Sequence, residues 1–392
     1  VVRLQYLQMQ CRSADVAEPR ALWPRVRLMA VRGYDKELAN LTGRLTGELE
    51  WPVAPVCVVD EAATAVGREP GDYTSKLDVK LKPDEHAIDA TRRVLQTLLE
   101  TLERNIPGTR ADLDSEFLHD LRVATRRTRS MLSQVKRVLP DPVVEDFKAR
   151  FAWLGQITGP VRDLDVFLLE LPHYRASLPA AMAGDLDAFE AKLRAAHKTE
   201  QAKLKRKLGS REMRELLRDW HAVLDADQPP GEPGWFADLP IERVASQRIW
   251  RMYKKVRKAG RAVTDDVPPE AMHELRKDCK KLRYLIEFFR GLYPSDDVKQ
   301  LVKALKVLLD NLGDFQDLEV QADKLRAYAR SFDPNDPATL PTVMAIGALV
   351  ADLLKRQQAA HGRFKDRFAA FDAPGNRRRY AELFKAKAYK QP

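Results

Sequence analysis

The stretch that decides the fold reads H-D-L-R-V-A-T-R-R-T-R from His119 to Arg129, and it returns as H-E-L-R-K-D-C-K-K-L-R from His273 to Arg283. The two copies lie 154 residues apart. The same offset, with no gap, relates Pro140 to Pro294, Gly159 to Gly313, Asp163 to Asp317, Asp165 to Glu319 and Val166 to Val320. A repeat that holds over this distance predicts one structural unit used twice.

Apolar residues follow a helical period almost throughout the chain from Asp84 onward. Helices are expected over 87–104, 117–139, 143–157, 164–171, 186–208, 213–224, 241–263, 272–292, 298–312, 318–332 and 343–371. Helices of this length with short connections predict an all-α fold of two pseudo-symmetric four-helix bundles, over 84–226 and 240–390. The Pro- and Gly-rich stretch 227–234 is the expected linker. Residues 1–80 are expected to form a small mixed or irregular segment.

Each copy of the repeated motif forms a two-faced helix. At about 100° per residue, four side chains share an arc of about 80°; they are His119, Arg122, Arg126 and Arg129 in the first copy, and His273, Arg276, Lys280 and Arg283 in the second. The apolar sector holds Phe117, Leu121, Thr128, Leu132 and Val135, or Leu275, Leu282, Ile286 and Phe289. Each helix is therefore expected to bury one face and to direct a basic stripe elsewhere.

The positive charge of the chain is concentrated in three segments. Residues 119–137, 248–261 and 273–290 carry net charges of +5, +7 and +3, while the whole chain carries +10. In the middle segment Arg251, Lys254 and Lys258 face away from the apolar side of their helix, and they are expected to bind the same anion as the two stripes. Focused cationic charge of this kind indicates a polyanionic partner. An Arg side chain can donate two parallel hydrogen bonds to a pair of phosphate oxygens. Lys adds a point charge, and a neutral His can donate one hydrogen bond. The plainer alternative is a solvated basic face.

An acid pair follows a Gly turn in each half, as Asp163 with Asp165 and as Asp317 with Glu319. Acids at a helix start satisfy free N–H groups and the helix dipole, which is the role expected here. A direct ion pair with the basic stripe is the alternative.

Composition excludes several classes of protein. Three scattered cysteines, Cys11, Cys57 and Cys279, do not form a disulfide or zinc framework, and they suit a reducing cytoplasm. No signal peptide or membrane span is expected, because the longest apolar stretch, around 342–354, is short and carries Asp352. No Walker loop, nucleophile elbow or Mg²⁺-binding carboxylate cluster occurs, so we expect a binding module without cofactor, metal or catalytic residue.

The motifs F-L-H-D-L-R-V-A-T-R-R-T-R (117–129), L-G-x-x-T-G-P-V-R-D-L-D-V (154–166) and H-E-L-R-K-x-x-K-K-L-R-Y (273–284) resemble the CHAD domain, the conserved-histidine α-helical domain. The resemblance covers roughly residues 85–390. It implies two pseudo-symmetric helical bundles around a basic channel that binds inorganic polyphosphate, and a location at polyphosphate granules. The binding positions carried over are the two stripes, from His119 to Arg129 and from His273 to Arg283.

Such domains often follow a CYTH triphosphatase-type domain, and the stretch from Gly71 to Leu77 is similar to the junction after one. The E-x-E-x-K signature that holds metal and triphosphate in that family does not occur in residues 1–80. We therefore expect no working CYTH tunnel in this chain, and we interpret residues 1–80 as a CYTH remnant and linker.

Three rival functions stay open at this point. Nucleic acid suits the pI of about 9.4 and the clustered Arg residues, although the stripes carry no interleaved aromatic side chains. Glu116 with His119, and Glu270 with His273, match the Glu-x-x-His spacing of di-iron bundles, but three bases follow each His and would repel a divalent ion. His119 or His273 as a phosphate acceptor is the third alternative.

Overall fold

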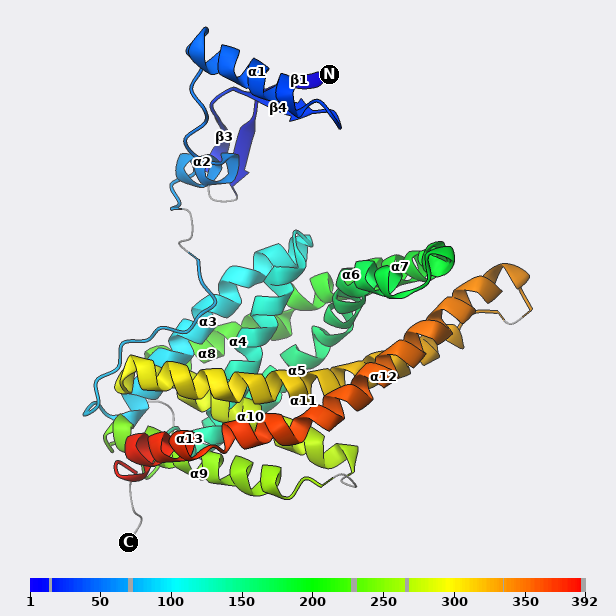
Figure 1. The fold of residues 1–392 in the computed structure, drawn as a ribbon. Helices are drawn as coiled ribbons and strands as arrows, with labels where there is room; N and C mark the ends of the chain where they lie inside the picture. The colour runs from blue at the N-terminus through cyan, green and yellow to red at the C-terminus, as the bar shows by residue number, and fades with distance from the viewer. Residues whose placement is uncertain (14–15, 70–72, 227–230, 265–267, 334, 389–392) are drawn as a thin grey trace. The chain divides into compact units, whose positions relative to one another are not determined.

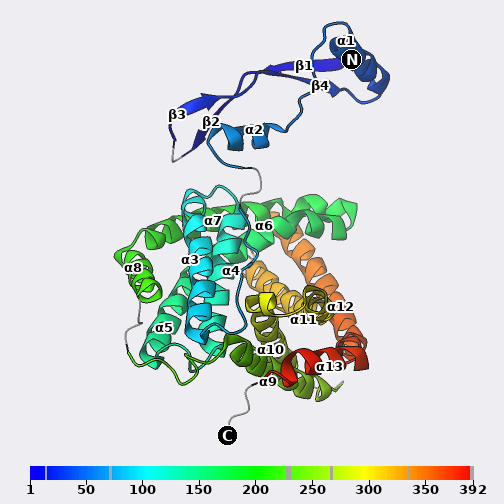
Figure 2. The same cartoon turned by 90° about the vertical axis from the view of Figure 1, so that its left-hand side faces the viewer.

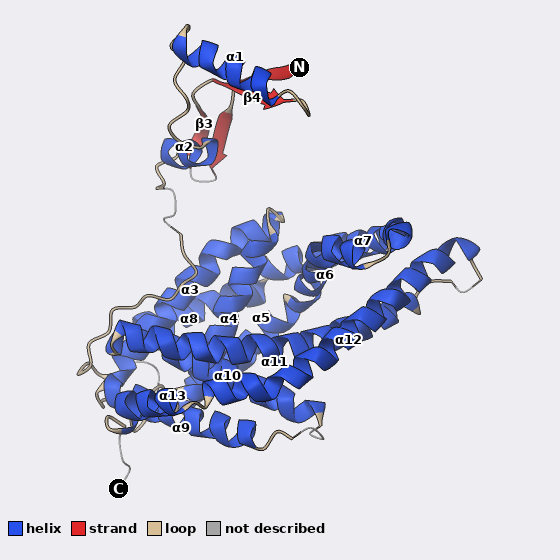
Figure 3. Cartoon of the chain, in the orientation of Figure 1, coloured by secondary structure: helices blue, strands red, loops and turns tan. Residues whose placement is uncertain are grey.

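The computed structural model describes residues 1–13, 16–69, 73–226, 231–264, 268–333 and 335–388 (Figure 1). These residues divide into two compact units, Val1–Thr74 and Ser75–Pro392. The second unit is built from helices, as Figure 3 shows, and this confirms the all-α prediction for the main part of the chain.

The N-terminal unit combines short strands with two helices: β1 (Val2–Leu7), β2 (Gln10–Ser13), β3 (Val16–Ala21), β4 (Arg25–Ala30), α1 (Asp35–Gly47) and α2 (Val58–Ala65). β1 pairs with β4 and β2 with β3, both antiparallel, so each sheet has only two strands. Leu22 is the one buried hydrophobic residue among the described residues of this unit. Tyr6, Trp23 and Trp51 instead line a wide apolar cavity of about 960 Å³.

The helical unit contains eleven α-helices and some short 3-10 and π turns among its described residues. The α-helices are α3 (Ala87–Ala111), α4 (Ser115–Gln134), α5 (Asp141–Ile157), α6 (Gly159–Ser177), α7 (Asp187–Leu208), α8 (Arg211–Asp225), α9 (Ile241–Arg261), α10 (Pro269–Phe288), α11 (Ser295–Ala329), α12 (Leu340–Phe371) and α13 (Pro374–Tyr380). The expected linker lies in part outside the described residues, at 227–230.

Helix starts follow the offset of the sequence repeat. α3 and α9 begin at Ala87 and Ile241, α4 and α10 at Ser115 and Pro269, and α5 and α11 at Asp141 and Ser295, which is 154 residues in each pair. The local start signals differ, since Asp114 Oδ1 accepts a hydrogen bond from the Glu116 N–H before α4, whereas Pro268 precedes α10. Symmetry between the two halves as complete bundles stays a prediction.

The break expected near residue 159 is present but only one residue long, whereas the break expected near residue 313 does not occur. α11 runs without interruption through Gly313, and Thr158, itself in the right-handed helical region, is all that separates α5 from α6. A lone Gly costs a helix only about 1 kcal/mol, and Pro160 stands in the first turn of α6, where no N–H bond is lost. The acid pairs therefore lie inside helices, and the prediction that they cap helix starts is wrong.

Two hydrophobic cores hold the helical unit together, and both contain residues from each half. The larger core joins side chains such as Leu121 of α4 and Leu282 of α10. The smaller, distal core packs α6 and α7 against the far parts of α11 and α12, where Tyr174 Oη donates to Gln321 Oε1 at 3.2 Å. Each core thus contains residues from both sides of the predicted linker region, 226–240. The predicted bundle boundaries, 84–226 and 240–390, stay predictions.

The long helix α12 contributes to both cores, with Ile346, Leu349 and Leu353 in the distal core and Phe364 and Phe368 in the larger one. By length and composition the span Pro337–Phe371 is the one stretch of the described residues that could cross a membrane. Ile346, Leu349 and Leu353 of this helix are buried against α6, α7 and α11.

Close packing of α9 on α12 makes Gly260 a sensitive position. A Cβ atom there would lie 2.0 Å from Phe368 Cε2, and the Phe368 ring is held between Phe364 and Phe371, at ring distances of 5.9 and 6.1 Å. We expect Gly260→Ala to lower the free energy of unfolding by about 1–3 kcal/mol, because overpacking forces the ring and backbone to shift. Chemical denaturation measures the change.

Gly362→Ala is the matched control for this substitution. Gly362 lies in α12 with no heavy atom within 4 Å of a new Cβ, so alanine is expected to leave stability unchanged or to raise it by up to about 1 kcal/mol. Equal stability losses in the two variants would show that steric packing at Gly260 is not the cause.

Candidate anion-binding site

The repeated helices α4 and α10 contact each other inside the helical unit (Figure 2). The predicted apolar sectors are confirmed: the side chains of Leu121, Thr128, Leu132 and Val135 are buried, and so are those of Leu275, Leu282, Ile286 and Phe289. Phe117 is only half-buried. Burial of these sectors fixes the rotation of both helices and leaves the basic faces outside the core.

The α4 stripe consists of His119, Arg122, Arg126 and Arg129, and no ion pair to a carboxylate occurs in it among the described residues. Arg126 and Arg129 are exposed. Arg122 is half-buried and donates from Nη1 to the Gly155 carbonyl at 2.9 Å and to Thr158 Oγ1 at 2.8 Å. These acceptors lie at the C-terminal end of α5, where the helix dipole favours a cation. The α4 stripe thus keeps most of its positive charge available.

His119 makes a contact that sequence reasoning missed. Arg162 of α6 donates from Nη2 to His119 Nδ1 at 3.0 Å. Because a guanidinium only donates, Nδ1 is the acceptor and the neutral ring carries its proton on Nε2. Burial, followed by the charge of Arg162, lowers the pKa of His119 below its usual range. The ring therefore offers one N–H donor at neutral pH.

The α10 stripe consists of His273, Arg276, Lys280 and Arg283, and the last three of these line a pocket of about 310 Å³ between α10 and α11. Arg276 donates to Gln316 Oε1 at 3.0 Å and pairs with Asp317 at 2.9 Å. Arg283 pairs with Glu287 at 2.6 Å. Lys280 has no hydrogen bond or ion pair among the described residues. The alternative given for the second acid pair, an ion pair with the basic stripe, is thus confirmed at Asp317.

Three carboxylates of α11 line the same pocket, and the sequence analysis did not identify two of them as site residues. Asp310, Asp314 and Asp317 follow each other at intervals of four and three residues, so they share one helix face. We name them the α11 acid stripe. The signal was present in the sequence, but the break expected at Gly313 placed Asp310 and Asp317 on different helices.

The two halves differ at these positions. The offset of 154 residues places Gln156 where α11 has Asp310, and Pro160 where it has Asp314. The α4 stripe consequently faces neutral groups of α5, whereas the α10 stripe faces carboxylates. Partial neutralisation therefore affects the α10 stripe more than the α4 stripe.

The two stripes lie close enough for their charges to interact. Burial first, and then Arg276 and the α4 residue Arg126, lower the pKa of Lys280 to about 8. Glu287 also joins the helices, because it accepts from Arg127 Nη2 of α4 at 3.0 Å while it pairs with Arg283. Repulsion between Arg126 and Lys280 is a cost that an anion placed between them would remove.

The basic residues of α9 are not part of this pocket. Arg251 lines a separate pocket with Lys136, Arg248 and Lys255, while Lys254 and Lys258 are exposed and line neither. The eight stripe residues are thus brought onto two neighbouring helices, and the three α9 residues are placed apart from them.

The metal alternative lacks its ligands. Glu116 and Glu270 are exposed to solvent, and Nδ1 of His119 is occupied by Arg162. Within the described part of the chain, no group of three or more His, Cys, Asp or Glu residues is arranged to hold a metal ion.

The depressed pKa of Lys280 predicts a pH dependence of anion binding. Because this pKa lies at about 8, the ammonium is charged at neutral pH and loses its proton as the pH rises. Affinity for a polyanion should therefore fall by about tenfold between pH 7 and about pH 10, which corresponds to one charge-assisted contact. Titration across this range with a phosphate chain measures the effect. Lys280→Arg keeps its charge throughout and should flatten the profile, and an equally steep fall in that variant would assign the dependence to another group.

The described residues form an all-helical domain in which α4 and α10 contact each other and each carries a basic stripe. The family model of the CHAD domain matches residues 93–326, more than half of the chain, and the chain belongs to the CHAD domain family.

Solved structures agree in fold. The crystal structure of the CHAD domain from the plant Ricinus communis is 24% identical, covers 77% of this chain and 98% of its own, and superposes with a TM-score of 0.63. PptA from Streptomyces chartreusis is 18% identical, covers 72% of this chain and 99% of its own, and gives a TM-score of 0.55. A comparison with curated proteins finds no match.

Proposed function

We propose that this protein binds inorganic polyphosphate, with the chain of phosphates lying along the α4 and α10 stripes. The observation that carries the proposal is the set of neighbouring cations on the two helices, in which the side chains of Arg126, Arg129 and Lys280 have no hydrogen bond or ion pair among the described residues. Arg and Lys side chains are the usual partners of phosphate oxygens. Membership of the CHAD family adds support, because the resemblance to that family implied this ligand.

The length of the stripe suits an extended anion. From His119 to Arg129 the α4 stripe spans about 15 Å at 1.5 Å per residue. A ligand with one charge in one place would leave most of these cations unpaired. A linear polyanion would neutralise them in series, which favours a phosphate chain over a single phosphate group at this site.

Nucleic acid is the rival polyanion. Tyr284 is the aromatic residue of the α10–α11 pocket, whereas Tyr253 is fully buried and Trp250 packs against it at a ring distance of 5.5 Å. Binding of single strands generally uses aromatic side chains on which successive bases stack. One tyrosine does not supply such a platform, and this favours a ligand without bases.

Direct competition tests the proposal. The full chain, loaded with fluorescently labelled DNA at about 150 mM salt, is titrated with polyphosphates of defined length, and the reverse experiment is run with labelled polyphosphate. We expect long polyphosphate to displace DNA and inositol phosphates, with an affinity that falls steeply as salt increases. Stronger binding of nucleic acid under these conditions would reverse the assignment.

We also propose that the protein acts as a binding module and not as a catalyst, in the cytoplasm. Arg162 already occupies Nδ1 of His119, so the ring proton is on Nε2 and neither nitrogen offers the free lone pair that a phosphoryl acceptor needs. Incubation with polyphosphate should release no orthophosphate and form no phosphohistidine, and detection of either product would contradict the proposal.

A further inference from the structure

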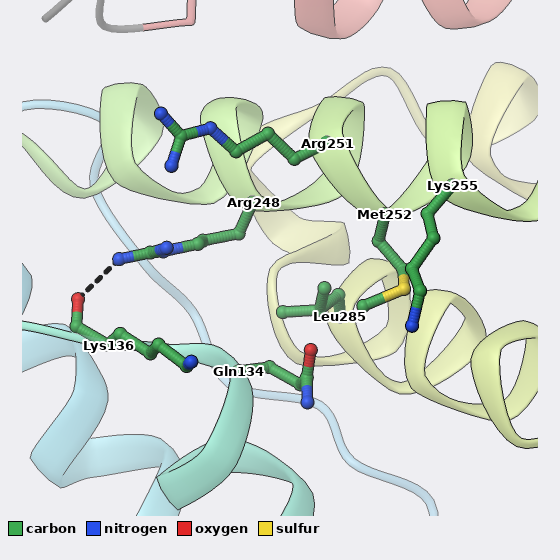
Figure 4. Close-up of a pocket in the computed structure, with 7 residues that line it drawn as sticks. All are labelled: Gln134, Lys136, Arg248, Arg251, Met252, Lys255 and Leu285. Carbon is green, nitrogen blue, oxygen red and sulfur yellow. Dashed lines mark hydrogen bonds between the residues drawn. The ribbon is translucent and has the colours of Figure 1, made fainter.

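A second basic pocket lies at the junction of α9 with the end of α4, and it is lined by none of the stripe residues. Lys136, Arg248, Arg251 and Lys255 surround a hollow of about 190 Å³, with Met252 and Leu285 as its apolar lining (Figure 4). We call it the α9 pocket. Leu285 follows Arg283 by two residues, or about 200° around α10, so α10 directs different faces to the two pockets.

The charge of the α9 pocket is largely without counter-ions. Lys255 pairs with Asp278 at 2.8 Å, but no ion pair to Lys136, Arg248 or Arg251 occurs among the described residues. No carboxylate lines the pocket. Arg248 donates from Nη2 to the Lys136 carbonyl at 2.6 Å, and its Nε is buried without a hydrogen-bond partner. A buried donor left unpaired is costly, and an incoming acceptor would remove the cost.

Like charges accumulate around Arg248. Burial, followed by Arg251 and then Arg137, lowers the pKa of Arg248 to about 10. Arg137 and Arg248 both lie over the Phe236 ring, at 6.0 and 5.6 Å from its centroid. The ring therefore holds two guanidinium groups near each other, an arrangement that repulsion opposes unless an anion offsets it.

The backbone beside the pocket is constrained. Arg137 has a φ of 64°, in the left-handed region that residues with a Cβ adopt infrequently. Phe236 N–H donates to the Arg137 carbonyl at 2.7 Å, and Gly234 N–H donates to the Val138 carbonyl at 3.2 Å. A Cβ at Gly234 would lie 2.3 Å from the Arg137 backbone, so only glycine allows this approach. The segment 234–236 thereby fixes the turn that follows α4, and strain retained at such a turn is typical of a ligand site.

We infer that the α9 pocket is a second anion site, which takes a compact phosphate ligand of the pyrophosphate class independently of the two stripes. Its volume of about 190 Å³, smaller than the 310 Å³ of the α10–α11 pocket, suits a short anion. Arg248 and Arg251 would bind phosphate oxygens through their paired N–H groups, with Lys136 as a point charge. No aromatic side chain lines the pocket, so a nucleotide base has no stacking partner there.

Calorimetric titration of the full chain with pyrophosphate, without divalent cations, tests this inference. The pocket variant, Lys136→Ala with Arg251→Ala, removes two exposed cations and should weaken pyrophosphate binding by at least about tenfold. The matched control, Lys254→Ala with Lys258→Ala, removes the same charge from exposed positions of α9 outside the pocket and should bind as the unmodified chain does.

A third variant separates the two sites. With Arg126, Arg129 and Lys280 replaced by alanine, pyrophosphate binding at the α9 pocket should persist while binding of long polyphosphate is lost. The inference is overturned if the unmodified chain does not bind pyrophosphate, if the pocket variant binds it normally, or if the Lys254 and Lys258 control loses it equally. If long polyphosphate did not bind to the unmodified chain, the proposed function would be contradicted, but the inference about the α9 pocket would not.

Discussion

Replacing Arg126, Arg129 and Lys280 by alanine together is expected to weaken binding of long polyphosphate by about 10³-fold or more. A charge-assisted hydrogen bond contributes about 1.5–3 kcal/mol, and about 1.4 kcal/mol corresponds to tenfold in affinity. The side chains of these three residues lack hydrogen-bond and ion-pair partners among the described residues, so their removal leaves no buried charge uncompensated. The melting temperature should change little, and calorimetry with a polyphosphate of defined length measures the affinity.

The control for this variant removes three cations from another surface. Lys205, Arg206 and Lys207 are exposed at the end of α7, and their replacement by alanine changes the net charge equally. This control variant should change the affinity for polyphosphate only slightly, because long-range attraction is screened at physiological salt. The salt dependence gives a second readout, since each lost phosphate contact reduces the slope of log affinity against log salt by about 0.7. If both variants lost the same amount of affinity, the binding would come from the overall charge of the protein and not from the α4 and α10 stripes.

Removal of two acids should act in the opposite direction. Asp310→Asn with Asp314→Asn is expected to raise polyphosphate affinity by about tenfold or more, because two like charges no longer oppose the ligand at the α10–α11 pocket. Asparagine keeps the size of the side chain. Asp314 lies 4.0 Å from Arg363 at the surface, a pair that contributes little to stability. The same calorimetric titration measures the gain.

Asp296→Asn with Asp323→Asn is the matched control on the same helix. Both residues are exposed, form only local pairs with Lys299 and Arg326, and lie outside the pocket. We expect these changes to raise affinity far less than the pocket pair does. A similar gain from both double variants would mean that net charge, and not the α11 acid stripe, limits binding.

The sequence was sufficient to predict the two basic stripes because helical period and burial determine them together. Once Leu121 and Leu282 are placed in the core, the spacing of three and four residues brings Arg122, Arg126 and Lys280 to the opposite side. The family followed from the same motifs. None of these inferences required knowledge of how the two helices pack.

Contacts between segments that are distant in the chain could not be predicted from the sequence. Nothing local to His119 indicates Arg162 as its partner, because that contact depends on how α6 packs against α4. The left-handed turn at Arg137 likewise depends on Gly234, about a hundred residues away. The helix break predicted at Gly313 was wrong for a different reason. Glycine has a low helix propensity, but tertiary packing keeps α11 helical through this residue.

The structure of this protein bound to a polyphosphate of defined length tests the central claim most directly. We predict phosphate groups within hydrogen-bonding distance of Arg126 on α4 and of Lys280 on α10 in the same bound chain. A ligand that contacts one of these helices alone, or that lies on a surface remote from both, would contradict the account.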